Sequence, residues 1–308
     1  MFTAQRTERP PVARGDRPSM VTSYLHMIRF SHTLFALPFA LAATVVIAVR
    51  HRAEIDVTAF KVLLIVVAFT GMRSFAMAIN RIADRHIDAL NARTATREIP
   101  AGKLSVRAVS VFAVLSLGVT VVCGWLLSPV AGLLAAPAAI VVATYSLAKR
   151  FTWLCHFWLG AAIGMAPPAV YVALLQRVPT EALLMQGVLT FYIAGFDILY
   201  ALQDYEFDRR QGLHSIPARF GVARAMLISR LSHLIAALFA AALLYSLQAR
   251  PASWLAYCVL AGLFVAEHWL VGPLKKPRFE KIPVAFFNVN SAFSLVFLAT
   301  VTLAVMLK

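Results

Sequence analysis

Residues 60 to 88 read FKVLLIVVAFTGMRSFAMAINRIADRHID, a long apolar run that ends in a row of polar side chains. About twenty apolar residues are enough for one α-helix to cross a bilayer. Residues four apart share a helix face, so Asn80, Asp84 and Asp88 would form one row at the end of that helix. The stretch therefore predicts a membrane-spanning helix that presents carboxylates at one end.

A second stretch of the chain repeats this pattern. Asp197, Tyr200, Asp204 and Asp208 have similar spacing at the end of the apolar run at residues 182–203. Two carboxylates about 6 Å apart repel by roughly 2 to 3 kcal/mol at an effective dielectric constant of 20, so each row calls for a bound cation. All-oxygen ligand sets favour a hard ion such as Mg²⁺, which is usually shared with substrate phosphates. The two rows therefore predict Mg²⁺ as a cofactor.

The composition indicates that both rows belong to a membrane protein. Of the 308 residues, 60% are hydrophobic and 14% are charged, and the mean hydropathy is +0.76, well above that of a soluble domain. We expect an all-α integral membrane protein with about nine transmembrane helices around a central cavity. The expected spans are residues 31–49, 60–80, 107–127, 129–148, 152–175, 182–203, 222–247, 252–271 and 283–307.

The chain is expected to form one domain behind a short tail. Residues 1–23 are polar and rich in Arg and Pro, which predicts a disordered basic tail, whereas residues 24–308 predict a single transmembrane domain. Each acidic row is also followed by a basic loop that contains Ile-Pro-Ala, at residues 99–101 and 216–218. We interpret this faint repeat as two related halves whose helix ends face one another across a shared cavity.

The net charge of +15 is distributed unevenly among the expected loops. Most Lys and Arg residues fall on the side of the membrane that holds the N-terminus and both acidic rows. The positive-inside rule therefore predicts a cytoplasmic N-terminus and cytoplasmic acidic rows, and an odd number of spans places the C-terminus on the other side. We expect a multi-pass protein of a bacterial-type inner (cytoplasmic) membrane. The basic charge is interpreted as topology and contact with the lipid bilayer, not as binding to nucleic acid.

The carboxylates also allow a structural interpretation. Because Arg residues lie beside them, each row could be a solvated, salt-bridged helix end. Two rows of the same spacing favour a functional site instead. Basic side chains in the neighbouring loops supply what a phosphate-bearing ligand needs beside a metal ion. These side chains are Arg97, Lys103, Lys149 and Arg150.

The motifs at residues 80–88 (NRIADRHID) and 197–208 (DILYALQDYEFD) resemble the paired aspartate motifs of the UbiA superfamily of intramembrane aromatic prenyltransferases. The resemblance runs through nearly all of residues 24 to 308. It includes RTATREIPAG at residues 93–102 and YSLAKRFT at residues 145–152. Within the superfamily the chain is most similar to the 4-hydroxybenzoate polyprenyltransferases. It departs from the pattern at Glu98-Ile99, where many members have Pro-Leu or a similar apolar pair.

The resemblance implies Mg²⁺-dependent transfer of a polyprenyl group from a polyprenyl diphosphate to 4-hydroxybenzoate or a related aromatic acid, in ubiquinone or menaquinone biosynthesis. The implied metal ligands are Asn80, Asp84, Asp88, Asp204 and Asp208. The implied substrate-binding residues are Asn80, Arg97, Tyr145, Lys149 and Arg150. Lys103, from its place in a basic loop, and Arg73, from its position on the helix, are also expected to bind substrate. The implied catalytic residues are Asp84, Asp204, Asp197 and Tyr200, of which the last two would steady an allylic cation or accept the ring proton. Tyr200 could equally be a packed interfacial tyrosine.

Arg73 lies outside both acidic motifs. It is seven residues before Asn80, and therefore about 10 Å deeper on the same helix face. A charge at that depth is costly in lipid, so Arg73 should face a polar cavity and an anionic partner. That partner is either Asp197 in the other half or the carboxylate of the aromatic acceptor, which a guanidinium binds in a bidentate geometry.

Prenyl transfer to another acceptor and cation-coupled transport are the alternative functions. A transporter should carry its carboxylates near the bilayer midplane on broken helices, whereas these rows lie at expected helix ends among basic loops. The CDP-alcohol phosphotransferases also place Asp rows at a membrane edge. Their Asp-Gly-x-x-Ala-Arg signature does not occur in this sequence.

Overall fold

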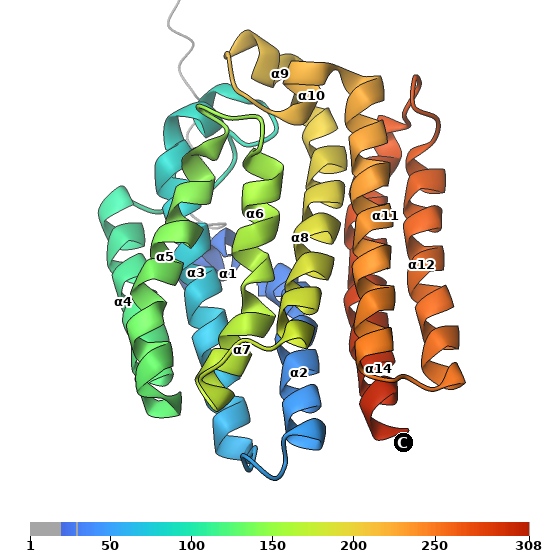
Figure 1. Ribbon diagram of the computed structural model, residues 1–308. Helices are drawn as coiled ribbons and strands as arrows, with labels where there is room; N and C mark the ends of the chain where they lie inside the picture. Colours follow the sequence, from blue (N-terminus) through green and yellow to red (C-terminus); the bar gives the residue numbers. More distant parts are fainter. Residues whose placement is uncertain (1–19, 29, 308) are drawn as a thin grey trace, which may run out of the picture.

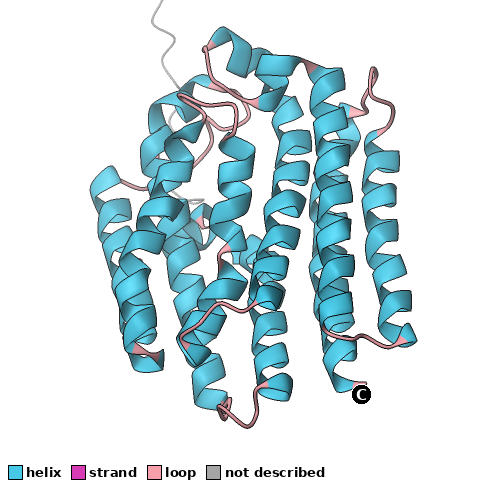
Figure 2. Ribbon diagram, in the orientation of Figure 1, coloured by secondary structure: helices cyan, strands magenta, loops and turns pink. Residues whose placement is uncertain are grey.

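The computed structural model describes residues 20–28 and 30–307, and within them all regular structure is helical (Figures 1 and 2). The expected tail at residues 1–23 lies outside the described residues except for its last four, which begin the first helix. The helices are α1 (Met20–Met27), α2 (Phe30–Arg50), α3 (Ala59–Leu90), α4 (Val106–Leu127), α5 (Pro129–Ala148), α6 (Cys155–Gly164), α7 (Ala166–Leu175), α8 (Thr180–Ala201), α9 (Tyr205–Arg210), α10 (Ile216–Phe220), α11 (Val222–Ser246), α12 (Pro251–Val271), α13 (Ile282–Val284) and α14 (Asn290–Met306). Short 3₁₀ turns lie at Leu202–Asp204 and Phe279–Lys281, and a π turn lies at Ala285–Val289.

Seven helical segments within the described residues are long and apolar enough to cross a membrane, which indicates a multi-pass membrane protein. They are α3, α4, α5, α6 with α7, α8 with α9, α11 and α12. The helices at Ala36–Arg50 and Asn290–Met306 are apolar but shorter. Each expected span overlaps an apolar helix, but the number of nine crossings is not confirmed.

The longest helix, α3, carries the first acidic row. Its 32 residues span about 48 Å, which exceeds the roughly 30 Å hydrocarbon core of a bilayer. The helix begins after Thr58, whose side chain accepts a hydrogen bond from the Lys61 backbone N–H. Asp84 and Asp88 lie in its last two turns, so α3 carries them toward the end of the bundle where the loops gather (Figure 1).

The long helices pack against one another in a ring. Along this ring α3 packs on α4 and α4 on α5, while α6 packs on α8 and α8 on α11. On the other side α14 packs on both α2 and α12. A cavity of about 690 Å³, called the central cavity below, is lined by residues of α2 to α8 and by Asn290 of α14, and most of its lining side chains are apolar.

Small residues bring α6 close to α8. A Cβ atom on Gly160 would lie 2.2 Å from the Thr190 carbonyl oxygen, and a Cβ atom on Gly164 would lie 3.1 Å from the Gln186 carbonyl oxygen. Both contacts are with backbone atoms that cannot move aside cheaply. The chain then breaks between α6 and α7, where Pro167 follows directly, because proline removes a helical hydrogen bond.

The second acidic row differs from its expected form. A single helix through Asp208 was expected, but α8 ends at Ala201 and a 3₁₀ turn at Leu202–Asp204 precedes α9. A 3₁₀ helix has 3.0 residues per turn instead of 3.6, so the residues after it are rotated relative to a continuous α-helix. Asp197 and Tyr200 therefore lie on α8, whereas Asp208 lies on a separate short helix.

Candidate active site

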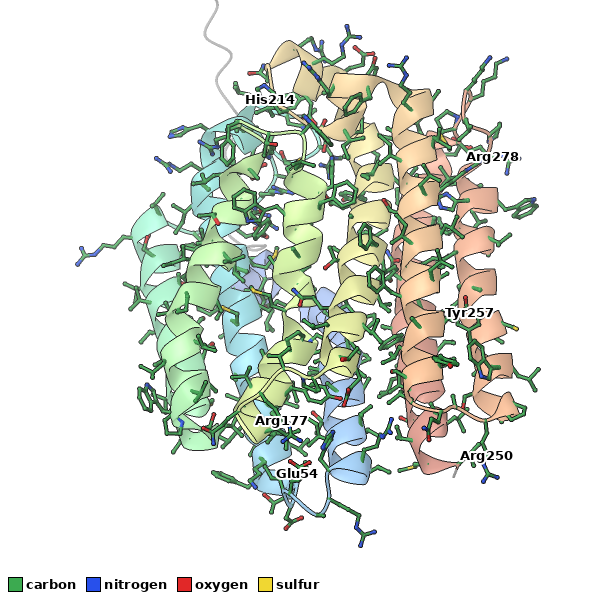
Figure 3. All side chains as sticks on the ribbon, in the orientation of Figure 1. Glu54, Arg177, His214, Arg250, Tyr257 and Arg278 are labelled. Atoms are coloured by element: carbon green, nitrogen blue, oxygen red, sulfur yellow. The ribbon has the colours of Figure 1, made fainter. Side chains whose placement is uncertain are left out.

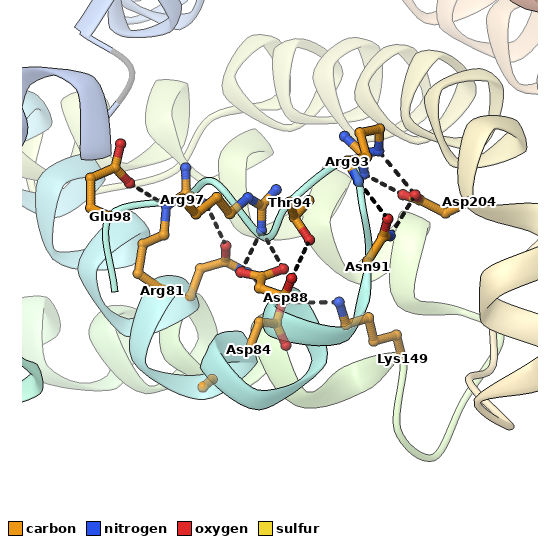
Figure 4. Close-up of polar contacts among 12 residues, drawn as sticks. Arg81, Asp84, Asp88, Asn91, Arg93, Thr94, Arg97, Glu98, Lys149 and Asp204 are labelled. Atoms are coloured by element: carbon orange, nitrogen blue, oxygen red, sulfur yellow. Dashed lines mark hydrogen bonds and ion pairs between the residues drawn. The ribbon is translucent and has the colours of Figure 1, made fainter. Parts of the chain in front are cut away.

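Asp84 is the most enclosed carboxylate of the first row, with only 2% of its surface exposed. Its Oδ2 atom lies 2.9 Å from Lys149 Nζ and accepts a hydrogen bond from Asn80 Nδ2 at 3.2 Å. Its Oδ1 atom lies 3.5 Å from Arg150 Nη2. Because Lys149 and Arg150 directly follow α5, the loop after that helix supplies the cations for the row on α3 (Figure 4).

The loop after α3 folds back over Asp88. Arg97 Nη1 lies 2.8 Å from both carboxylate oxygens of Asp88, and the Thr94 hydroxyl donates to the Asp88 backbone carbonyl at 3.1 Å. Further along the loop, Glu98 Oε2 lies 3.5 Å from Nε of the buried Arg81. Glu98, which departs from the family pattern, therefore helps to hold this loop against α3.

The same loop also reaches the second acidic row. Arg93 donates through Nε to Asp204 Oδ1 at 2.9 Å and through Nη2 to Asp204 Oδ2, and Asn91 Nδ2 donates to Oδ1 at 2.9 Å. Asn91 and Arg93 were not among the expected site residues. They join the two motifs, which are more than one hundred residues apart in the sequence, into one polar cluster (Figure 4).

Besides Asp204, Arg93 also binds Tyr200, another of the expected catalytic residues. Its Nη1 donates to the Tyr200 hydroxyl at 3.0 Å, and its guanidinium carbon lies 5.1 Å from the centre of the Tyr200 ring. Burial by itself would lower the pKa of Arg93, but the hydrogen bond and the charge of Asp204 outweigh burial and raise it above the usual value. Arg93 therefore stays cationic throughout the physiological pH range.

Asp197 has a partner that was not expected from the sequence. His156 on α6 accepts a hydrogen bond at Nε2 from the Ile216 backbone N–H at 3.3 Å. In the neutral ring Nδ1 must then carry the proton, so it donates to Asp197 Oδ2 at 2.7 Å. This contact joins α6 to α8 and orients the Asp197 carboxylate. The structure thus gives Asp197 a histidine partner. The pairing of Asp197 with Arg73, which the sequence suggested, stays a prediction.

The polar cluster lies at one end of the central cavity. Asn80, Tyr145 and Arg73 all line that cavity, as expected for residues that contact a substrate. Three further polar residues, Thr120, Tyr192 and Asn290, line it as well. The Tyr192 hydroxyl donates to Asn290 Oδ1 at 2.8 Å, which leaves the buried Asn290 Nδ2 without a hydrogen-bond partner in the described structure.

A model of the UbiA prenyltransferase family matches residues 36–292. The chain belongs to the UbiA prenyltransferase family. The match covers both acidic rows and the basic loop between them, so the family assignment and the observed polar cluster concern the same residues.

Curated members of the UbiA family are similar over most of this chain. The chain is 32% identical to a 4-hydroxybenzoate octaprenyltransferase of Aliivibrio fischeri (strain MJ11), over 74% of its length and 78% of the relative's. It is 33% identical to a protein of the same name from Tolumonas auensis, over 80% of its length and 85% of the relative's.

Solved UbiA structures share the fold. A UbiA homologue from Aeropyrum pernix K1, solved in the apo state, superposes with a TM-score of 0.76 at 28% identity and covers 87% of this chain and 96% of its own. A UbiA homologue from Archaeoglobus fulgidus, bound to GPP and Mg²⁺, has a TM-score of 0.65 at 20% identity, over 91% of this chain and 99% of its own. The second likeness concerns the fold alone.

In this UbiA protein three of the expected metal ligands, Asp84, Asp88 and Asp204, are paired with basic side chains. Within the described residues no group of three or more His, Cys, Asp or Glu side chains could by itself hold a metal ion. Mg²⁺ is usually bound through only one or two carboxylates, and waters and substrate phosphates complete its shell. The all-oxygen donor set therefore fits a divalent ion that arrives together with a diphosphate.

Two expected site residues lie apart from these contacts. Lys103 is exposed, and its side chain makes no hydrogen bond or ion pair with the described residues. Asp208 is buried on α9 but forms no ion pair with the Lys and Arg side chains that the structure describes. The structure thus brings Asp84, Asp88 and Asp204 together with basic side chains and leaves Lys103 outside.

Proposed function

We propose that this UbiA protein transfers a polyprenyl group from a polyprenyl diphosphate to 4-hydroxybenzoate or a related aromatic acid, in a Mg²⁺-dependent step of quinone biosynthesis. The observation that carries this proposal is the single polar cluster formed by the two acidic rows above an apolar cavity. The names of the curated relatives support the aromatic acceptor. The relatives from Archaeoglobus fulgidus, solved with GPP or DMAPP and Mg²⁺, support the prenyl diphosphate.

The basic side chains of the cluster would bind the diphosphate. Lys149, Arg150, Arg97 and Arg93 each contact a carboxylate in the structure, and each can turn toward phosphate oxygens, which charged donors bind strongly. Exposed Lys103 would draw the anionic substrate toward the cluster. Bound Mg²⁺ would act as a Lewis acid that neutralises the leaving diphosphate. The residues that would hold it are Asn80, Asp84, Asp88, Asp204 and Asp208.

The apolar cavity would hold the prenyl chain. Breaking the allylic C–O bond leaves a delocalised cation that water would quench, so the reacting carbon must lie in a dry space. Most residues that line the cavity are apolar, and several of them, such as Leu134, are also exposed on the outside of the bundle. A long isoprenoid tail could therefore pass from the cavity toward the lipid.

Arg73 would bind the carboxylate of the aromatic acceptor, because a guanidinium holds a carboxylate in a fixed bidentate geometry. Tyr145 lines the cavity with it. A ring carbon of the acceptor would form the new C–C bond as the C–O bond to diphosphate breaks. Asp197 would then accept the ring proton, and His156 would orient it for that step. Tyr200, hydrogen-bonded to Arg93, would help to steady the cation.

The membrane arrangement is part of the same proposal. The two shorter apolar helices would complete nine crossings, with residues 24–308 as one domain of two related halves. The acidic ends of α3 and α8 lie at the end of the bundle where the basic loops gather, which the positive-inside rule assigns to the cytoplasm. The N-terminus would then be cytoplasmic, and the inner membrane of a bacterium would hold the protein.

The proposal is tested by product formation with purified protein, radiolabelled prenyl diphosphate, Mg²⁺ and 4-hydroxybenzoate. Asp84→Asn and Asp204→Asn keep the side-chain size but remove a charge, so turnover should fall roughly 100-fold or more. EDTA should abolish turnover. A wild-type rate for either variant, or full activity in EDTA, would refute the mechanism.

Glu54→Gln is a matched control for these variants. Glu54 lies at the opposite end of the bundle, in an exposed ion pair with Arg177 at 2.7 Å (Figure 3). Hydrogen bonds from His51 and Arg177 lower the pKa of Glu54, so the substitution also removes a negative charge at neutral pH. Because exposed pairs contribute little to stability, this variant should turn over at the wild-type rate.

A further inference from the structure

A second cavity, outside the proposed active site, lies between α11 and α12. Its volume is about 1070 Å³, and it is lined by one face of each helix and by the loop that follows α12. On α12 it extends from Tyr257 to Gly272 at the end of the helix, which corresponds to about 22 Å at 1.5 Å per residue. One leaflet provides about half of the roughly 30 Å hydrocarbon core. The groove is therefore long enough to hold a lipid acyl chain.

The sides of the groove are apolar and face outward. Leu234 on α11 and Val265 on α12 line it and are exposed, and Trp269 at its rim is 72% exposed. Near its far end the Tyr257 hydroxyl donates to the Ala237 backbone carbonyl at 3.2 Å and ties the two helices together. The groove is thus open to the membrane along its length and bridged near one end.

The other end of the groove is basic. Arg230 Nη2 donates to the Gly272 carbonyl at 3.0 Å, and the Arg278 side chain lies over Gly272, with Cγ 3.5 Å from where a Cβ atom would be. Lys275 lines the groove from the same loop. None of these three cations forms an ion pair with a carboxylate in the described part of the chain. Figure 3 shows Arg278 near the end of α12. Three cations that line the same end of one groove repel one another, and a bound anion would relieve that repulsion.

Two buried polar atoms point to the kind of anion. Arg230 Nε and His268 Nδ1 have no hydrogen-bond partner among the described residues. His233 Nε2 lies 3.3 Å from the Tyr192 carbonyl, so in neutral rings it carries the proton, and His233 Nδ1 accepts from His268 Nε2 at 3.0 Å. His268 Nδ1 is then an acceptor without a partner among the described residues, and like Arg230 Nε it is covered by neighbouring atoms that a bound headgroup would have to displace. The end of the groove thus offers donors for phosphate oxygens and an acceptor for a hydroxyl group.

We propose that this groove binds one molecule of an anionic phospholipid with a glycerol headgroup, a phosphatidylglycerol-type lipid. The phosphate would contact Arg230, Lys275 and Arg278, and a headgroup hydroxyl would donate to His268. One acyl chain would lie along the apolar face between α11 and α12. Basic pockets between transmembrane helices bind anionic lipid headgroups by the same combination of charge and apolar contact.

Native mass spectrometry of the full chain, titrated with phosphatidylglycerol or with phosphatidylcholine of the same acyl chains, tests the proposal. The wild-type protein should retain phosphatidylglycerol preferentially. Replacing Arg230, Lys275 and Arg278 together by Gln should weaken its binding at least about tenfold, because each basic residue contributes to anionic lipid attraction. Equal retention of the two lipids by the wild-type protein would overturn the proposal.

A matched control separates the groove from general surface charge. Arg224, Lys276 and Lys281 are exposed, occur in the same part of the chain and do not line the groove, so replacing them by Gln removes the same charge elsewhere. This control should bind phosphatidylglycerol within about twofold of the wild type, since it keeps the pocket. A loss equal to that of the groove variant would show that the lipid is held by non-specific attraction.

Two further measurements test the groove site if the triple variant does not fold. Ala261→Phe fills the apolar part of the groove without changing a charge and should also weaken lipid binding, whereas unchanged binding would contradict the groove site. Inorganic phosphate at millimolar concentration should not displace the lipid. Displacement by phosphate would identify a site for the free anion and overturn the lipid proposal.

Discussion

Replacing Lys149 by Met should destabilise the metal-free protein. Lys149 Nζ lies 2.9 Å from Oδ2 of Asp84, whose surface is 2% exposed. At an effective dielectric constant of 20 this pair attracts by about 6 kcal/mol, and removing one partner of a buried pair costs about 3 to 5 kcal/mol. Arg150 and Asn80 still contact Asp84 in the variant. We therefore expect a net loss of about 2 to 3 kcal/mol.

Thermal unfolding of the detergent-solubilised protein measures this loss. In EDTA a destabilisation of that size should lower Tm by about 5 °C for a chain of this length. Mg²⁺ should then stabilise the variant more than the wild type, because the ion no longer competes with the Lys149 ammonium for Asp84. A tenfold gain in Mg²⁺ affinity corresponds to about 1.4 kcal/mol, or about 3 °C of additional Tm shift.

Lys276→Met is the control, since Lys276 is exposed and its side chain makes no ion pair with a described residue. It should change neither Tm nor the response to Mg²⁺. The reasoning fails if Lys149→Met unfolds at the wild-type temperature in EDTA. It also fails if Mg²⁺ shifts both proteins equally, because Lys149 and the metal would then not compete for Asp84.

Three further outcomes are expected. Arg73→Leu should raise the KM for the aromatic acceptor at least about tenfold and leave the affinity for prenyl diphosphate nearly unchanged, and an unchanged acceptor KM in steady-state assays would favour a structural ion pair. Gly160→Ala should lower Tm through a loss of about 1 to 3 kcal/mol, whereas Gly262→Ala, whose Cβ meets no atom within 4 Å, should not. Reporter fusions in the loops at residues 88–106 and 208–222 should both be cytoplasmic, and an external result for either would contradict the shared site.

The helical architecture and the position of the acidic rows were predictable from the sequence. Uncharged runs of about twenty residues specify membrane helices almost without regard to their neighbours, because the unpaired backbone cannot enter lipid. The spacing of Asn80, Asp84 and Asp88 is a local property of one helix, and α3 carries all three. Family resemblance and local spacing therefore both predicted that Asn80, Asp84 and Asp88 form a row on one helix.

The contacts that assemble the site were less accessible to sequence reasoning. Arg93 reaches Asp204 from more than one hundred residues away, and His156 reaches Asp197 from another helix. Both pairs depend on how α3, α6 and α8 pack against one another. The spacing of polar and apolar residues along a single helix does not specify that packing. His156 directly follows Cys155 within an apolar span, so only its polarity in that setting could have marked it.

The break in the second row had a similar cause. Periodicity alone favours one continuous helix through Asp208, since residues 197 to 208 contain neither Gly nor Pro. The structure inserts a 3₁₀ turn that ends at Asp204, the carboxylate that Arg93 binds. The position of this turn suggests that tertiary contacts of Asp204, not local propensity, determine where α8 ends.

The carboxylate rows called for cations, and the structure supplies basic side chains in that role. Asp84, Asp88 and Asp204 pair with Arg93, Arg97, Lys149 and Arg150. Asp208 pairs with none of these cations, but it is near enough for the charges of Asp204 and Lys149 to act on its pKa. When all four carboxylates are ionised, their charges cancel those of the four cations. A diphosphate adds several negative charges in a poorly hydrated site, where unpaired charge is costly. Additional positive charge must therefore enter with the substrate, and this requirement explains why a site that is already neutral would still depend on Mg²⁺.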